Sequence, residues 1–490
     1  MILSKDNSTY KEIAKSTWIF GSSQVVVLLV NVLKTKFIAI FLGTQGYGLI
    51  SLFNSTINLI GSLTGFGLGT SAIKDIAEYK ETNYEKSLET VSLVRKLVWY
   101  TGVLGMFFFI ALSPFLSNFI FGNKDYTWAF VILSFSILIN QLTIGNSVIL
   151  TGLRKRKNLA NANMSGAILG FVFSIPLYYL FGEKAIVPTI LISSFVSFLR
   201  SKYFTREIDV PKNNLSFKES LVKGKPMLLM GLMLSLTSVF TFLKAFVLRI
   251  FIEKTGGIDQ VGLFHSGFVL INVYLGMIFS VMSKDYFPNL ASKIFDHKQT
   301  ENLMNKQLIF GLTIISPLLC LFIVFNNYLI VLLFSVKFKL MHLMIAWAVL
   351  GTIFKLVSWT QSYYILTKGN NKRFVLNELS AVIFTTILSI IFYYYYSLTG
   401  LGIAYFLGYI YYALQTNLLS KYWYGFQFSI NSFFFILLNS LIVGLCFYSS
   451  IIIKVNFLGF LLLFISICIS YFKMKKMGFT SKLNSIFKKA

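Results

Sequence analysis

Five basic residues lie inside stretches of sequence that are otherwise apolar: Lys34, Lys36, Lys244, Arg249 and Lys355. A central lysine or arginine in a membrane-spanning helix costs about 2.5 to 3.5 kcal/mol on insertion scales, so it needs a hydrated cavity, a partner or access to the interface. Glu378 is the only comparable acid, and it lies near one end of its stretch. Unbalanced cations in a low-dielectric setting attract polyanions. The chemistry expected here is anion binding, for which a lipid-carried pyrophosphate is a natural fit.

The depth of these residues separates two interpretations. Lys34, Lys244 and Lys355 lie about 8 to 13 residues, or about 12 to 20 Å, from either end of their stretches. Snorkelling to the headgroups explains such deep positions poorly. Arg249 lies about one turn from an end, so snorkelling remains open for it. Lys36, two positions from Lys34, points to a different side of the helix.

Uncharged polar residues follow the same helical spacing as the deep lysines. They form four stripes: Gln24, Asn31 and Lys34; Ser51, Asn54 and Asn58; Thr237, Thr241 and Lys244; and Lys355, Ser358 and Ser362. These stripes predict the wall of a polar cavity, although such residues also pack helices together in membranes.

The elements that carry these residues are membrane-spanning helices. The chain of 490 residues is 56% hydrophobic and 13% charged, which exceeds the apolar content that a soluble core buries. Its basic residues outnumber acidic ones 44 to 18, but this hydropathy excludes nucleic acid as a partner. Apolar stretches of about 20 residues predict an all-α polytopic membrane protein with about fourteen spans.

Orientation follows from the lysines and arginines between the spans. With the N-terminus inside, the cytoplasmic segments contain 33 basic residues and the opposite loops contain six. Short cytoplasmic loops retain positive charge, so both termini are expected to be cytoplasmic. We expect the protein in the bacterial inner membrane, without a cleaved signal peptide.

An internal repeat with an offset of about 215 residues relates two groups of six spans. ILTG at 149–152 resembles ILTKG at 365–369, SKYF at 201–204 resembles SKYW at 420–423, and KTKFIAIF at 34–41 pairs with KAFVLRIF at 244–251. Six spans per repeat imply parallel halves with the substrate site between them, where Lys34 and Lys244 occupy equivalent positions. The expected organisation is an N-terminal bundle at 1–205, a cytoplasmic linker at 206–225, a C-terminal bundle at 226–424, and two further helices with a basic tail at 425–490.

Other chemistries lack support in the sequence. Cys320, Cys446 and Cys468 show no metal-ligand spacing, the three histidines are scattered, and no P-loop or glycine-rich nucleotide motif is present. We therefore expect no metal, no cofactor and no enzymatic activity.

The segment from Phe41 to Tyr79, FLGTQGYGLISLFNSTINLIGSLTGFGLGTSAIKDIAEY, resembles the start of Wzx-type O-antigen translocases, which share a superfamily with multidrug and toxin extrusion (MATE) transporters. The resemblance implies two six-helix bundles, alternating access, and outward flipping of undecaprenyl-pyrophosphate-linked oligosaccharide for O-antigen, as in lipopolysaccharide, or a related surface polysaccharide. It also implies a cation-lined cavity, membrane-lipid contact and other surface-polysaccharide assembly proteins as partners. Some relatives use a coupling ion, proton or sodium, which this sequence does not identify.

Three alternatives stay open. A multidrug cation exporter is expected to carry deep acidic residues, whereas the deep charges here are basic. A lipid II flippase also has fourteen spans, so the sequence opposes it only weakly. A membrane glycosyltransferase or polymerase needs a large outer loop with catalytic acids or a metal site, and the outer loops here are short.

Overall fold

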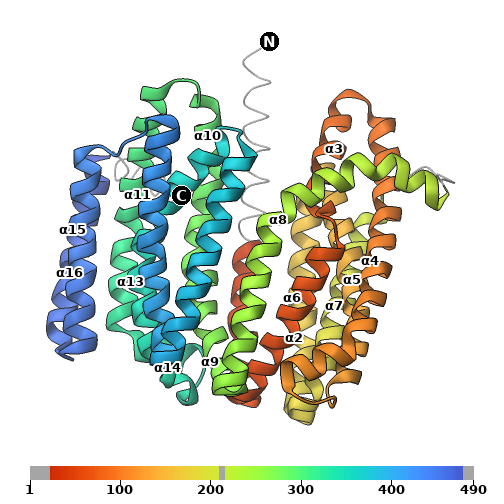
Figure 1. Ribbon diagram of the computed structural model, residues 1–490, viewed down its shortest axis with the longest axis horizontal. Helices are drawn as coiled ribbons and strands as arrows, with labels where there is room; N and C mark the ends of the chain where they lie inside the picture. The colour runs from red at the N-terminus through yellow and green to blue at the C-terminus, as the bar shows by residue number, and fades with distance from the viewer. Residues whose placement is uncertain (1–22, 209–215, 478–490) are drawn as a thin grey trace, which may run out of the picture. The chain divides into compact units, whose positions relative to one another are not determined.

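A computed structural model describes residues 23–208 and 216–477, and every regular element in those ranges is helical. The chain divides into two compact units, residues 1–262 and 263–490. Figure 1 shows both as bundles of long helices, which confirms the all-α fold class predicted from hydropathy.

The described part of unit 1 opens on the helix Ser23–Phe41. The helices that follow are α2 (Gly43–Thr64), α3 (Leu68–Thr82), α4 (Tyr84–Phe121), α5 (Thr127–Gly152), α6 (Arg156–Phe181), α7 (Ile186–Thr205) and α8 (Phe217–Gly256), with a 3₁₀ turn, η1 (Gly182–Ala185), between α6 and α7. The division between the units falls within α9 (Ile258–Val269).

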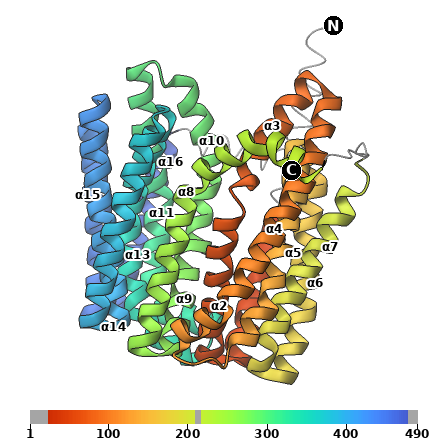
Figure 2. The ribbon, with the colours of Figure 1, turned by 45° about the vertical axis from the view of Figure 1, so that its right-hand side comes forward.

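Unit 2 continues from α9 through a π-helical turn, η2 (Leu270–Leu275). Its other elements are α10 (Gly276–Lys293), α11 (His297–Val324), α12 (Asn326–Leu333), the 3₁₀ turn η3 (Val336–Met341), α13 (His342–Thr367), α14 (Asn371–Tyr424), α15 (Ile430–Phe447), the π-helical turn η4 (Tyr448–Ile452) and α16 (Asn456–Lys476). Both α15 and α16 pack against α11 and against each other (Figures 1 and 2).

The number of membrane spans agrees with the prediction. Eleven helical runs among the described residues are long and apolar enough to cross a membrane, and the bent pair α2–α3 makes a twelfth. Two runs contain 50 and 54 residues and fold back on themselves, at η1 and at Ser397, whose φ is 49°. Counting each of these hairpins as two spans gives the predicted fourteen.

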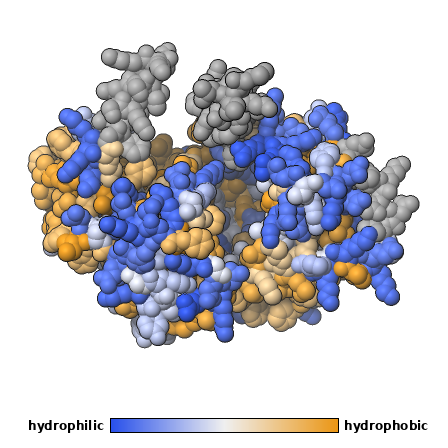
Figure 3. Space-filling model, turned by 90° about the horizontal axis from the view of Figure 1, so that it is seen from above, coloured by the Kyte–Doolittle hydropathy of each residue, from blue (hydrophilic) through white to orange (hydrophobic). Residues whose placement is uncertain are grey.

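The surface has the polarity of a membrane protein. Phenylalanine and leucine side chains such as Phe107, Phe115 and Phe464 are more than half exposed along the helices. Figure 3 shows one face of the molecule, on which hydrophilic side chains gather over the helix ends and hydrophobic ones appear at the sides. Because lipid tails solvate apolar side chains, this distribution fits a multi-pass membrane protein.

Glycines let α8 cross the break between α2 and α3 at backbone contact. A Cβ atom on Gly67, whose φ is +60°, would lie 1.9 Å from the carbonyl oxygen of Gly231, and one on Gly231 would lie 2.3 Å from the carbonyl oxygen of Phe66. Only glycine fits such an approach. Figure 1 shows α8 bent towards its N-terminal end, where Pro226 lacks a backbone donor.

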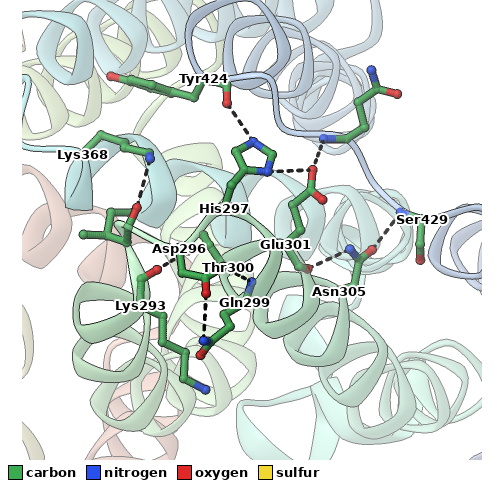
Figure 4. A network of polar contacts seen from close by, with 12 residues as sticks. Lys293, Asp296, His297, Gln299, Thr300, Glu301, Asn305, Lys368, Tyr424 and Ser429 are labelled. Carbon is green, nitrogen blue, oxygen red and sulfur yellow. Dashed lines mark hydrogen bonds and ion pairs between the residues drawn. The ribbon is translucent and has the colours of Figure 1, made fainter.

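A polar network holds the connection between α14 and α15 to the start of α11 (Figure 4). His297 Nε2 lies 3.1 Å from the carbonyl oxygen of Tyr424, and Glu301 Oε1 accepts from the backbone N–H of Gln427 at 3.4 Å. Asn305 Oδ1 accepts from the backbone N–H of Ser429 at 3.0 Å. These bonds fix the point at which α15 begins.

The predicted domain boundaries differ from the compact units. Part of the predicted linker, residues 209–215, lies outside the described residues, as does the basic tail from 478, and α8 already begins at Phe217. In addition, α8 packs against α2, α3 and α4 of unit 1. The division into two six-helix repeats at 206–225 therefore stays a prediction.

Candidate functional site

Lys355 lies on α13, half-buried in unit 2, among side chains from three other elements. Its Nζ atom donates to Asn272 Oδ1 at 3.2 Å, and it lies 5.5 to 5.9 Å from the ring centroids of Phe279, Tyr405 and Tyr409. Aromatic faces at this distance attract a cation, by about 0.5 to 2 kcal/mol each depending on desolvation. The lysine side chain is thus held against side chains from three other elements of unit 2.

The local folding of two elements builds this arrangement. Asn272 belongs to η2, where the chain leaves α-helical geometry for one π-helical turn, a distortion found frequently at functional sites. Tyr405 and Tyr409 are four residues apart on the second arm of α14, so both side chains lie on one face of that helix. Tyr412 continues the row, with its ring 6.5 Å from that of Tyr409.

The tyrosine row ends at Glu378, the one acid that the sequence singled out. Its Oε1 atom accepts from the hydroxyl of Tyr412 and from Ser362 Oγ at 2.7 Å. Asn377 Nδ2 lies 3.4 Å from the same oxygen. Ser362 is two helical turns, or about 10 Å, along α13 from Lys355. Unit 2 therefore carries a cation and a carboxylate on one face of α13, with tyrosines alongside.

The other four predicted cations belong to unit 1, and all are half-buried. Lys34 and Lys36 lie on the helix Ser23–Phe41, and Lys244 and Arg249 lie on α8. Arg249 Nε donates to Ser51 Oγ on α2 at 2.6 Å, and its Nη1 donates to the carbonyl oxygen of Ala245 at 2.7 Å. The structure thus joins Arg249 to a neighbouring helix, where snorkelling was the open alternative.

The uncharged candidates fall into different environments. Gln24 and Asn54 are half-buried, while Asn31 and Thr241 are exposed. The hydroxyls of Thr241 and of Ser358, which is 1% exposed, donate to carbonyl oxygens of their own helices, Thr237 and Lys355 respectively. Asn58 is also exposed, and it lines a cavity of unit 1.

Sequence reasoning missed the partners of Lys355. Four residues that are distant from it along the chain were not predicted as site residues: Asn272, Phe279, Tyr405 and Tyr409. The helical spacing of Tyr405, Tyr409 and Tyr412 was a signal that could have been found, since all three lie on one face. Asn272 gave no such signal, because its position depends on the π-helical turn.

Comparison with known proteins places the chain in a family. Residues 37–343 match the sequence profile of the family described as "Polysaccharide biosynthesis protein". The lipid III flippase of Escherichia coli (strain K12) is 23% identical over 373 residues, which cover 75% of this chain and 88% of that protein.

Two solved structures show the same fold. One is the inward-facing conformation of a multidrug resistance MATE family transporter of the MOP superfamily, with a TM-score of 0.71 and 16% identity over 81% of this chain and 94% of that one. The other is the inward closed conformation of the lipid II flippase MurJ, with a TM-score of 0.69 and 18% identity over 93% of this chain and 99% of that one. The resemblance to Wzx-type translocases inferred from Phe41 to Tyr79 is confirmed, and the chain belongs to the polysaccharide biosynthesis protein family.

Proposed function

We propose that this protein flips a polyprenyl-pyrophosphate-linked oligosaccharide from the cytoplasmic to the periplasmic leaflet by alternating access. The substrate expected is the undecaprenyl-pyrophosphate-linked repeat unit of O-antigen or a related surface polysaccharide. The family match and the similarity to a lipid III flippase support a lipid-linked oligosaccharide as the substrate class. The proposal includes no catalytic step.

The observation that carries the proposal is the incomplete coordination of Lys355. A lysine ammonium has three N–H donors, and one of them bonds to Asn272. Within residues 23–208 and 216–477, Lys355 makes no ion pair with a carboxylate. The aromatic rings attract the cation but accept hydrogen bonds only weakly. An anionic oxygen of a pyrophosphate would satisfy the remaining donors.

The cations of unit 1 extend this proposal. Lys34 and Lys244 are half-buried on helices long and apolar enough to cross the membrane, where a positive charge is costly unless water, a polar partner or an anion accompanies it. We assign both as contacts for the pyrophosphate in unit 1, with Lys36 and Arg249 contributing to the positive potential. The high charge density of the pyrophosphate and the low dielectric of the surroundings strengthen the attraction between the pyrophosphate and these cations.

A complementation assay tests the role of Lys355. Lys355→Ala should reduce surface polysaccharide about tenfold or more in cells depleted of the wild-type protein, because a hydrogen bond between charged groups contributes about 1.5 to 3 kcal/mol. Lys355→Arg should be milder, since the charge remains. Lys339→Ala, which removes an exposed lysine in η3, is the matched control and should leave polysaccharide unchanged.

Each variant must first be shown to insert at the wild-type level by quantitative blotting of membrane fractions. Full polysaccharide display by the triple variant Lys34→Ala, Lys244→Ala and Lys355→Ala would refute the cationic contacts. The distribution of lysine and arginine further leads us to propose an inner-membrane location with both termini in the cytoplasm. Reporter fusions at each terminus test that orientation.

A lipid II flippase is the second candidate, because the fold similarity to MurJ extends over 99% of that chain. The lipid-linked intermediate that accumulates when the protein is depleted separates the two functions. A surface-polysaccharide repeat unit on its polyprenyl carrier supports the first proposal. Accumulation of a peptidoglycan precursor would replace it with the second.

A further inference from the structure

A pocket of about 270 Å³, lined by both polar and apolar side chains, lies within unit 1, where α2, α3, α5 and α8 meet. Its hydrogen-bonding side chains include Asn58, Ser62, Asn140, Gln141 and Ser238, and Phe242 adds one aromatic ring. We call it the α2–α8 pocket. It is slightly smaller than the sites of about 300 to 1,000 Å³ that hold drug-sized ligands, so it suits a single ring.

Several polar groups of this pocket have no partner among the described residues. Asn58, Ser62, Asn140 and Ser238 make no side-chain hydrogen bond with residues 23–208 or 216–477. Gln141 is 6% exposed and donates through Nε2 to Thr101 Oγ1 at 3.2 Å, while its Oε1 atom accepts no hydrogen bond from the same ranges. Asn58 and Ser238 are exposed and Ser62 and Asn140 are half-buried, so their donors and acceptors are open to solvent and available to a polar ligand.

The helix backbones keep the pocket open. At one end, α8 contacts the α2–α3 break through Gly67 and Gly231, and beyond the other end a Cβ on Gly48 would lie 2.1 Å from the carbonyl oxygen of Ile258. Between these contacts, a Cβ on Gly61 would meet nothing within 4 Å. The absence of side chains at this position creates space rather than close packing.

The pocket lining is uncharged, unlike the cationic positions. At 100° per residue, Ser238 and Phe242 lie about 120° and 160° around α8 from Lys244, on the opposite side of the helix. Arg249 shares the pocket's side of α8, but it lies about 10 Å further along and bonds to Ser51. A phosphate would therefore find no countercharge in the lining.

Amides and hydroxyls beside one aromatic ring match the chemistry of a neutral sugar. Each asparagine offers both a donor and an acceptor, as the hydroxyl groups of a pyranose require, and an aromatic ring packs against the apolar C–H face of such a ring. We infer that the α2–α8 pocket binds one uncharged sugar ring of the lipid-linked oligosaccharide. This inference rests on the proposed function and assigns the sugar and the pyrophosphate to separate positions.

Binding of free monosaccharides to the full-length protein in nanodiscs tests the inference. The probes are glucose, galactose, N-acetylglucosamine and N-acetylgalactosamine, each followed by saturation-transfer NMR, and inorganic pyrophosphate, followed by calorimetry. At least one sugar should bind, and the double variant Asn58→Ala and Asn140→Ala should weaken it about fivefold or more while pyrophosphate binding is retained. Asn163→Ala, an exposed asparagine on α6 away from the pocket, is the control.

Gly61→Leu provides a second, independent variant, because it places a side chain into the open space and should abolish sugar binding. Sugar binding that survives both the double variant and Gly61→Leu would overturn the inference. Binding of pyrophosphate without any sugar would also overturn it and would leave the proposed function intact. Binding of neither probe would count against both.

Discussion

The crossing of α8 over the α2–α3 break supports a quantitative prediction for Gly231→Ala. The added Cβ would lie 2.3 Å from the carbonyl oxygen of Phe66 and 2.8 Å from Ser71 Oγ. Because the first of these is a backbone atom, the helices must separate, and overpacking of this kind costs about 1 to 3 kcal/mol. Replacing glycine by alanine within a helix recovers about 0.5 to 1 kcal/mol. Taken at the middle of both ranges, the net loss should be about 1 kcal/mol.

Thermal unfolding of the purified protein in detergent, followed by tryptophan fluorescence, measures this loss. At about 2 to 4 °C per kcal/mol for a domain of this size, Gly231→Ala should melt about 2 to 4 °C below wild type. Gly61→Ala is the matched control, since its Cβ meets nothing within 4 Å and alanine is the better helix former. It should melt at or above the wild-type temperature. A Gly231→Ala protein as stable as wild type would refute the close crossing.

Two further predictions concern side chains that satisfy donors. Ser51→Ala removes the acceptor for Arg249 Nε and should destabilise the protein by about 1 to 3 kcal/mol in the same assay. The control, Ser55→Ala, loses only a hydrogen bond within its own helix and should destabilise the protein less. Equal losses of stability in the two variants would contradict the role of Arg249. The side chain of Asp296 caps α11, and the hydrogen bond from the backbone N–H of Gln299 lowers the pKa of its carboxyl group. The stability that the charged cap contributes is therefore complete above the ordinary pKa of 3.8 and is lost as the pH falls through the lower folded-state pKa. Asp296→Asn keeps an acceptor without the charge, so its melting temperature should fall less than that of wild type between pH 5 and pH 3. An identical fall in both proteins would disprove the contribution of the Asp296 charge to stability.

The membrane spans could be predicted from sequence because they depend on local hydropathy. The start of α8 could not be placed in the same way. We expected it at residue 226, whereas the helix begins at Phe217 and continues through Pro226. The sequence contained the relevant signal, since Ser216 and Glu219 form a capping box. Hydropathy does not detect caps, because a polar first turn has the composition of a loop.

The site was predictable only in its cations. Lys355 stood out because a charge within an apolar stretch is rare, but its contacts with Asn272, Phe279 and Tyr409 depend on how distant helices pack. The contact between Gly67 and Gly231 is likewise invisible in the sequence, where both residues are ordinary glycines of apolar segments. Long-range pairing is the information that a single sequence lacks.

The five predicted cations are distributed unevenly between the units, and this has a consequence for energetics across a charged membrane. The helix Ser23–Phe41 and α2 contain no acidic residue, and the acids of α8, Glu219 and Glu253, lie in its first and last turns. Unit 2, in contrast, carries one predicted cation, Lys355, and the acid Glu378. An elementary charge that moves across 100 mV changes the free energy by about 2.3 kcal/mol. On the proposed function, movement of the unit 1 cations across the membrane field would therefore depend on the membrane voltage, and a bound pyrophosphate would reduce that dependence through its opposite charge.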